Sequence, residues 1–403
     1  MQAPLAGVRV LEVGNYMAGP FCAMQLADLG ADVVKVESPA AAGDEVRKTE
    51  PFLGPERESS TFVRLNRNKR SLALDLKASA GKQVFRELVE RFDVVVENLR
   101  PGTMADLELD YHRLARLNPR LVYVAASGWG QDGPYSQLAG LDIVAQGMSG
   151  LMSITGEPDG DPVKVGVPVT DLVCALYGAL ACVSALRARD RDGRGQLVDV
   201  SLFEAGVSLA IWEAGRYFAT GEVPRPLGSA HQSSAPYQAI RAADGWFTVG
   251  ATSPRNWEAF CRVLDRPEWI SDEGFRDNAS RHRHRAELAG LIEEVTRRRP
   301  ASEWVQRLQA VGVPSGAIQD YGQVFGDPHL HARDFFWEAP HAQLGQVRQL
   351  GSPMRFGETP VERRTAGPRF GEHSAEVLRE LGRSPEEIAR LAHEGVIVQA
   401  PCP

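Results

Sequence analysis

A carboxylate at the start of a long apolar run is the first residue that could do chemistry. Asp171 follows Thr170 in GVPVTDLVCALYGAL, and residues 172–186 carry no charged side chain. The run is too short to span a bilayer and predicts a buried core helix, whose free N–H groups Thr170 or Asp171 could cap. The helix dipole and those N–H groups would also hold the carboxylate ionised, as a carboxylate nucleophile requires. The residues alone leave both roles open.

A second segment gathers positive charge. Arg67, Lys69, Arg70 and Lys77 lie within NRNKRSLALDLK. Beside the end of a strand they could neutralise the phosphates of a nucleotide-like ligand, and a solvated charged surface is the alternative. The chain has 45 Lys and Arg against 52 Asp and Glu, a net charge of −7. No global basic field therefore favours nucleic acid or an anionic membrane, and an anionic ligand needs a local patch.

Residues 128–133, GWGQDG, match the dinucleotide pattern G-x-G-x-x-G directly after the strand-like run 121–127. Pro134 follows, and no amphipathic helix comes next, so a dinucleotide site is not predicted. A glycine-rich turn after a strand still lies at the edge where open α/β sheets bind ligands.

The histidines and cysteines do not predict a metal site. His282 and His284 are two residues apart in RHRHR, which indicates a solvated surface, while His231 lies in a Gly/Ser-rich segment typical of a substrate loop or a linker. The five cysteines are scattered and form no CxxC motif, as in proteins that keep reduced thiols. The first residues show no signal-peptide pattern, so we expect a cytoplasmic protein.

The elements that must position these residues alternate between strand and helix. Strands are predicted at residues 7–13, 32–37, 94–98 and 121–127, with helical segments such as PFCAMQLADLG between them. This order predicts an α/β fold with a parallel sheet covered by helices. The Pro/Gly/Ser-rich segment after residue 222 marks a boundary. We expect a large domain of residues 1–222 completed by 331–403, and a small domain of residues 223–330 with a hairpin turning at Asp244-Gly245.

Several blocks in register resemble the class III CoA-transferases, the formyl-CoA and carnitine-CoA transferase group. They are PLAGVRVLEVGNYMAGPFCAMQLADLGADVVKVE, NRNKRSLALDLK, VVVENLRPG, SGWGQDGPYSQLAGLD, and VPVTDL followed by GRGQLVDVSL. The resemblance continues to about residue 380. It implies a Rossmann-like large domain, a smaller α+β domain, and a homodimer whose chains pass through each other as interlocked rings. Coenzyme A would be a substrate, and no metal or other cofactor is implied.

The resemblance also assigns site residues. It makes Asp171 the catalytic nucleophile, which overrides the capping interpretation. It implies contacts to coenzyme A, with the basic cluster included, from Tyr16, Met17, Ala18, Arg70, Leu74, Lys77, Asn98 and Arg100. The backbone N–H groups of residues 128–133, around Gly130, and of residues 228–234 are candidate donors to the oxyanions of the reaction.

The resemblance to the formyl-CoA transferases does not extend to their substrate specificity. Asp106 and Ala139 stand where those enzymes carry arginine and lysine, so formate or oxalate is not expected. The segments ITGEPDGDPVKVGVPVTDL and GSAHQSSAPYQAIRAADGWFTVGA look more like the branch that uses dicarboxylates, typified by succinyl-CoA:glutarate CoA-transferase. A free second carboxylate would need cationic or hydrogen-bonding partners, for which the candidates are Arg47, His231 and Ser233. The alternative for Arg47 is a surface ion pair with Glu45 or Glu50.

Two other functions remain to be weighed. The α-methylacyl-CoA racemases of the same superfamily place a histidine before the aspartate of AGHD, whereas this chain has Leu141 there and lacks the second acid/base. A non-catalytic acyl-CoA-binding homologue would keep the coenzyme A segments and lose the carboxylate, yet Asp171 is present. Both comparisons favour the transferase.

Overall fold

The computed structural model describes residues 1–400, which divide into two compact units. Unit 1 contains residues 1–150, 165–209 and the segment from 331 onward, and unit 2 contains residues 151–164 and 210–330. The return of the chain at residue 331 agrees with the expected boundary. Residues 151–164 and helix α10 (Ile211–Thr220), however, belong to unit 2 rather than to the large domain.

Unit 1 is built on a seven-stranded sheet in the order β14-β5-β2-β1-β6-β7-β8. Six strands are parallel, and only β14 is antiparallel to its neighbour. The strands are β1 (Arg9–Val13), β2 (Asp32–Glu37), β5 (Lys69–Leu74), β6 (Val94–Glu97), β7 (Val122–Ser127), β8 (Leu197–Ser201) and β14 (Ile397–Val398). The predicted parallel sheet is confirmed, and residues 69–74, where a basic cluster beside a strand was expected, are themselves a strand.

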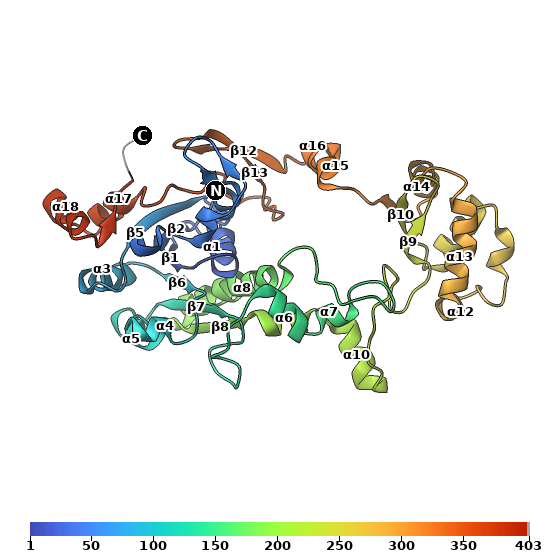
Figure 1. The fold of residues 1–403 in the computed structure, drawn as a ribbon, viewed down its shortest axis with the longest axis horizontal. Helices are drawn as coiled ribbons and strands as arrows, with labels where there is room; N and C mark the ends of the chain where they lie inside the picture. Colours follow the sequence, from blue (N-terminus) through green and yellow to red (C-terminus); the bar gives the residue numbers. More distant parts are fainter. Residues whose placement is uncertain (401–403) are drawn as a thin grey trace. The chain divides into compact units, whose positions relative to one another are not determined.

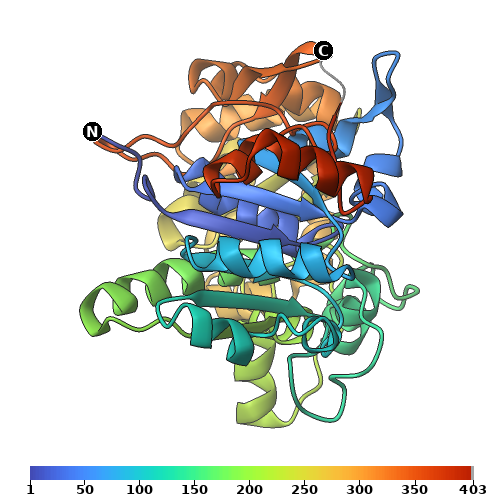
Figure 2. The same cartoon turned by 90° about the vertical axis from the view of Figure 1, so that its left-hand side faces the viewer.

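Helices cover both faces of this sheet because its inner strands are apolar on both sides. On one face, α3 (Ser79–Val89), α5 (Tyr111–Leu117), α17 (Ser374–Glu380) and α18 (Pro385–His393) share a core with the strands. On the other, α1 (Ala18–Asp28) and α8 (Val169–Asp192) do so. The last segment of the chain, red in Figures 1 and 2, lies beside the N-terminal strands because β14 pairs with β5.

Helix α8 is the predicted core helix. It is long and apolar enough to cross a membrane by length and composition, a test that core helices also pass. Its residues Ala175, Ala179 and Cys182 pack in the same core as α1. Gly178 faces α1 and β7 so closely that a Cβ there would lie 3.2 Å from Cys22 Sγ. The helix therefore begins inside unit 1, with Asp171 in its first turn.

Smaller elements complete unit 1. They are β3 (Phe52–Leu53), β4 (Glu58–Ser59), α2 (Ser60–Leu65), α4 (Thr103–Asp106), α6 (Asp142–Met148), α9 (Leu202–Ser208), β12 (Phe336–His341) and β13 (Gly345–Leu350), with short 3₁₀ helices at Pro39–Ala41 and Glu45–Lys48. Strands β12 and β13 pair as an antiparallel hairpin.

Unit 2 has its own core and a three-stranded antiparallel sheet in the order β11-β10-β9. Strands β9 (Tyr237–Arg241) and β10 (Trp246–Gly250) form the hairpin predicted around Asp244-Gly245. The remaining elements are α7 (Leu151–Ile154), α11 (Pro254–Val263), the 3₁₀ helix Pro267–Ile270, α12 (Asn278–Arg283), α13 (Arg285–Thr296), α14 (Ala301–Ala310), β11 (Ser315–Ala317) and α15 (Tyr321–Phe325), with α16 (Pro328–Ala332) at the boundary with unit 1.

Candidate active site

Asp171 is held in the first turn of α8 without acting as its cap. The cap position is Pro168, and no side chain caps the helix from that position. Asp142 serves instead: its Oδ1 accepts the Thr170 N–H at 3.0 Å and the Thr170 Oγ1 hydroxyl at 2.7 Å. The Asp171 carboxylate makes no hydrogen bond or ion pair with the residues that the structure describes. The capping interpretation is therefore wrong, and the carboxylate is available to a ligand.

The environment of Asp171 favours its protonated form. Burial, with a smaller contribution from the charge of Asp142, raises the pKa of Asp171 to about 7. We had expected the helix terminus to hold this group ionised, but Asp142 occupies the Thr170 N–H and adds a like charge. A carboxyl group with a strongly shifted pKa at the end of a buried helix is a candidate functional group. Near neutral pH, Asp171 is a partly ionised and more basic carboxylate.

The glycine-rich turn after β7 belongs to the same region. Its Gly130 N–H donates to Ser127 Oγ and its Gln131 N–H to Asp199 Oδ2, each at 2.9 Å. Burial, and after it the charges of Asp171 and Asp199, raise the pKa of the Cys174 thiol, which lies on α8 three residues after Asp171. Because Ser127 and Asp199 take up the N–H groups of Gly130 and Gln131, these two backbone donors are already occupied.

Side chains of the same turn supply donors that the sequence patterns did not single out. Gln131 Nε2 and Trp129 Nε1 are buried and have no hydrogen-bond partner among residues 1–400. Glu97, the last residue of β6, was also missed: burial raises its pKa to about 7. A polar residue at the end of a buried strand was the available signal for Glu97, whereas Asp142 is the first residue of α6 and follows no strand directly.

The β1–α1 turn presents three of the expected coenzyme A contacts at the carboxyl edge of the sheet. Tyr16 is exposed and has a left-handed φ of 61°, Met17 precedes α1, and Ala18 is buried. Asn98, which follows β6, accepts the Asn15 N–H at 2.9 Å and donates to the Asn15 carbonyl at 2.8 Å. The amide of Asn98 is therefore engaged in holding this turn.

Four buried charged side chains pair with one another beneath the β1–α1 turn. Lys35 Nζ lies 2.6 Å from Glu12 Oε1 and 2.9 Å from Asp44 Oδ2, and Lys69 Nζ lies 2.7 Å from Glu12 Oε2. The same groups reach the turn itself: Lys35 donates to the Gly14 carbonyl at 2.8 Å, Lys69 to the Pro20 carbonyl at 2.7 Å, and Asp44 accepts the Tyr16 N–H at 3.1 Å. We call Glu12, Lys35, Asp44 and Lys69 the buried quartet.

The predicted basic cluster does not form one patch. Arg67 binds Asp28 with two hydrogen bonds, of 3.0 and 2.5 Å, Lys69 belongs to the buried quartet, and Arg70 binds Asp32 and Glu380. Arg70 and Asp32 lie at the beginning of their strands, the edge of the sheet opposite to the turns described above. These residues are close together in the sequence. In the folded chain, the alternating side-chain directions of β5 and the course of the strand give them different partners.

Three further expected contacts lie near the carboxyl end of the sheet. Lys77 follows β5 and is exposed, whereas the Leu74 side chain is buried in the core beneath α3. Arg100 follows β6 and donates a hydrogen bond to the Gln137 carbonyl, which ties two loops together. Lys77 is thus the member of the basic cluster whose place suits a phosphate.

Arg47 takes neither of the two roles expected from the sequence. Its Nε and Nη2 donate to Glu37 Oε2 and Oε1, both at 2.7 Å, and its guanidinium lies 3.6 Å from the centre of the Phe62 ring. Burial would raise the pKa of Glu37, but Arg47, with Lys35 and Ser71, lowers it to about 2. Glu45 pairs with Lys48 instead. The guanidinium group of Arg47 is therefore already bound to a carboxylate of the protein.

The remaining candidates lie in unit 2. His231 Nδ1 accepts the Ser233 N–H at 3.1 Å, and its ring packs against Trp212 and Tyr237. The RHRHR segment is the expected solvated surface only in part, because Arg283 and His284 are exposed whereas Arg281 is not. Arg281 is buried, donates to the carbonyls of Ala235 and Phe275, and lies over the Trp257 ring.

Comparisons with known proteins agree on the family. The chain matches the model of CoA-transferase family III over residues 5–374. It is 35% identical over 397 residues to a succinyl-CoA:glutarate CoA-transferase of Homo sapiens, covering 98% of this chain and 90% of that protein. A succinate–glutarate CoA-transferase of Agrobacterium fabrum is 35% identical over 393 residues, covering 96% and 97%.

A solved structure adds the same result at the level of the fold. The crystal structure of a CAIB/BAIF family protein from Brucella suis superposes with a TM-score of 0.84 and 36% sequence identity, covering 94% of this chain and 100% of that one. Both the family and the enzymatic class that the sequence blocks predicted are confirmed. The chain belongs to CoA-transferase family III.

Proposed function

We propose that this enzyme moves coenzyme A from a dicarboxylyl-CoA, such as succinyl-CoA, to a carboxylic acid through a thioester on Asp171. The observation that carries the proposal is a half-buried carboxylate, unpartnered among the described residues, in the first turn of α8. Its environment raises the pKa to about 7. Such a group is poised to attack a carbonyl at neutral pH because it is both ionisable and basic.

In the proposed reaction, the Asp171 carboxylate first accepts the acyl group of the donor and then coenzyme A. Asp171 Oδ attacks the thioester carbonyl of the donor, the C–S bond breaks, and a mixed anhydride and the thiolate of coenzyme A result. The thiolate then attacks the Asp171 carbonyl, releases the donor acid as its carboxylate and leaves an Asp171-CoA thioester. The acceptor carboxylate reverses both steps. No electron is gained or lost overall.

Each step passes through an oxyanion, which positioned donors stabilise. The side-chain amide of Gln131 and the indole N–H of Trp129 are buried donors that have no partner within residues 1–400. They suit this role better than the N–H groups of Gly130 and Gln131, which Ser127 and Asp199 already accept. We therefore assign the oxyanion contact to side chains of the GWGQDG turn.

The choice of a dicarboxylate rests on the relatives. Proteins that are 35% identical over nearly the whole chain are named succinyl-CoA:glutarate, succinate–glutarate and succinyl-CoA–D-citramalate CoA-transferases. Tyr16, Met17, Ala18, Leu74, Lys77, Asn98 and Arg100 remain the proposed contacts to coenzyme A, and Arg70 is withdrawn because of its place at the opposite sheet edge. Cytoplasmic location remains an expectation from the sequence.

A homodimer is the proposed assembly. Helix α10 has no buried residue, and its Ile211 and Phe218 are 73% and 83% exposed. Helix α8 also presents Leu176 and Leu180, which are 50% and 63% exposed. On each of these helices, large exposed apolar side chains indicate a face that another protein covers. The family resemblance makes a second copy of this chain the proposed partner, in interlocked rings.

The test is replacement of Asp171. The Asp171→Asn and Asp171→Ala variants should lose CoA transfer by at least about a thousandfold, because the covalent nucleophile is gone. Hydroxylamine or borohydride added with succinyl-CoA should label Asp171 in the native enzyme, as peptide mass spectrometry would show. Turnover that survives in the alanine variant would disprove the mechanism.

Thermal unfolding provides the folding control. Because folding raises the pKa of Asp171, its ionised form destabilises the folded state above neutral pH. At pH 8 the Asp171→Asn variant should therefore melt no lower than the native enzyme, and loss of transfer cannot be attributed to unfolding.

A further inference from the structure

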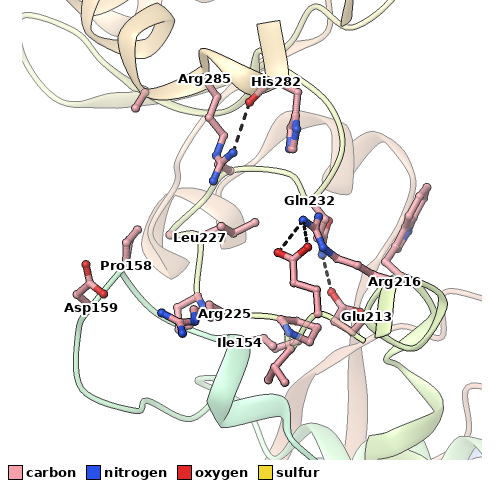
Figure 3. Close-up of a pocket in the computed structure, with 18 of the residues that line it drawn as sticks. Ile154, Pro158, Asp159, Glu213, Arg216, Arg225, Leu227, Gln232, His282 and Arg285 are labelled. Carbon is pink, nitrogen blue, oxygen red and sulfur yellow. Dashed lines mark hydrogen bonds and ion pairs between the residues drawn. The ribbon is translucent and has the colours of Figure 1, made fainter. Parts of the chain in front are cut away.

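A cavity of about 1010 Å³ lies wholly within unit 2. Its walls come from α10, from the segment 222–230 that follows it, from residues 154–160, and from the end of α12 and the start of α13. Three arginines face it, Arg216, Arg225 and Arg285, together with His282 and apolar side chains that include Trp212 and Leu227 (Figure 3). Nothing in the mechanism above uses this cavity.

Two of the three lining carboxylates are already engaged. Arg216 Nη2 donates to both carboxylate oxygens of Glu222, at 2.8 and 2.7 Å. Glu213 Oε1 accepts a hydrogen bond of 2.8 Å from Gln232 Nε2. On this side of the cavity, the carboxylates of Glu222 and Glu213 therefore already have hydrogen-bonding partners within the protein. The third carboxylate, Asp159, is exposed.

Two guanidinium groups are left over. Arg225 makes no hydrogen bond or ion pair with the described residues, and Arg285 makes only a 3.4 Å hydrogen bond to the His282 carbonyl. Figure 3 shows both on the left of the view, apart from the dashed Arg216–Glu222 contact. His282, labelled beside Arg285 in Figure 3, has a buried Nε2 with no hydrogen-bond partner within the described chain. The cavity thus offers more unpaired donors than acceptors.

We propose that this cavity is a binding site for a short dicarboxylic acid, with Arg225 and Arg285 each taking one carboxylate. A guanidinium binds a carboxylate through two parallel hydrogen bonds, so two such groups in the lining of one cavity favour a ligand with two carboxylates. The Trp212 and Leu227 side chains give the carbon chain an apolar wall, and His282 is a further donor. The choice of acid rests on the proposed function, whereas the presence of an anion site does not.

Equilibrium binding tests the assignment on the full-length enzyme without coenzyme A, where no turnover occurs. Isothermal titration with succinate and with butyrate compares two chains of equal length that differ in one carboxylate. Arg225→Met and Arg285→Met should each weaken succinate binding by about tenfold, the loss expected for one charge-assisted contact. Butyrate should bind more weakly than succinate to the native enzyme.

Arg255→Met is the matched control, since Arg255 is an exposed arginine of unit 2 that does not line the cavity. It should leave succinate binding within twofold of the native value. Equal loss in the control, unchanged binding in both cavity variants, or a change of oligomeric state in those variants on sedimentation overturns the proposal. Asp171→Ala should retain succinate binding while losing transfer, so failure of the cavity and failure of the nucleophile give different results.

Discussion

At the scale of single residues, the proposed chemistry depends on a carboxylate that has no partner among the described residues. Asp171 has no partner in the described chain because Asp142 receives the Thr170 N–H and hydroxyl in its place. Burial and the Asp142 charge then raise the pKa of Asp171 to about 7. Burial is thus the larger influence on the proposed nucleophile, and the charge of Asp142 adds a smaller one.

This arrangement predicts the pH dependence of transfer. The attacking form of Asp171 is the carboxylate, so the rate should rise with pH through about 7 and fall about tenfold for each unit below it. Asp142→Asn removes the like charge and should move the midpoint of the profile to lower pH, while its amide oxygen can still accept from Thr170. A pH–rate profile of kcat/KM for both enzymes measures this, and an unmoved midpoint would count against the role of Asp142.

A second prediction compares two basic residues, Lys77 and Arg70, that lie at opposite ends of β5. Lys77→Ala should raise the KM for succinyl-CoA several-fold with little change in kcat, because a phosphate contact stabilises substrate and transition state alike. Arg70→Ala removes the same charge from the opposite sheet edge and should leave KM unchanged. Equal effects of the two variants on KM would show that Lys77 has no local contact with coenzyme A.

At the scale of elements, the site depends on turns at the carboxyl edge of a parallel sheet, the place where such sheets bind ligands. The β1–α1 turn is held by Asn98 from β6 and by the buried quartet from β1, β2, β5 and the Asp44 segment. Charges in an apolar interior stabilise a structure only when each has its partner. We therefore expect the quartet to position the turn.

Lys35→Met tests this positioning. It leaves Glu12 and Asp44 short of a cation and should lower the free energy of unfolding by about 3–5 kcal/mol, the usual cost of breaking a buried ion pair. It should also raise the KM for acyl-CoA, because the Gly14 carbonyl loses its donor and Asp44, which accepts the Tyr16 N–H, loses its cation. Lys48→Met is the control: its pair with Glu45 is exposed, so the loss should stay below about 1 kcal/mol. Urea unfolding and kinetics on both variants decide the question.

At the scale of the whole molecule, exposed apolar helices point to assembly. Phe218→Ser and Leu180→Ser should shift the enzyme from dimer toward monomer in sedimentation velocity, because each removes an apolar group from the proposed interface. Ser184, on the exposed side of the same helix as Leu180, offers a neutral control as Ser184→Ala. A native enzyme that sediments as a monomer would contradict the dimer directly.

The sequence by itself determined the class of fold and the family, and it singled out the residue that we propose as the nucleophile. β-branched runs alternating with apolar helices predict a parallel sheet because strand and helix periodicity are local properties of the chain. Asp171 was identified through the motif blocks around it, and the hairpin at Asp244-Gly245 through its turn residues. Each of these signals is contained within a few consecutive residues.

Only the tertiary structure decided which charges meet. In the basic cluster, Arg67 pairs with Asp28, Lys69 with Glu12 and Arg70 with Asp32, so three of its four charges are neutralised. Arg47, outside the cluster, pairs with Glu37. Asp142, Gln131, and Arg225 and Arg285, which have no ion pair with the described residues, emerged for the same reason. The pKa of a carboxylate and the freedom of a guanidinium depend on burial and on partners tens or hundreds of residues away, and no local pattern records them.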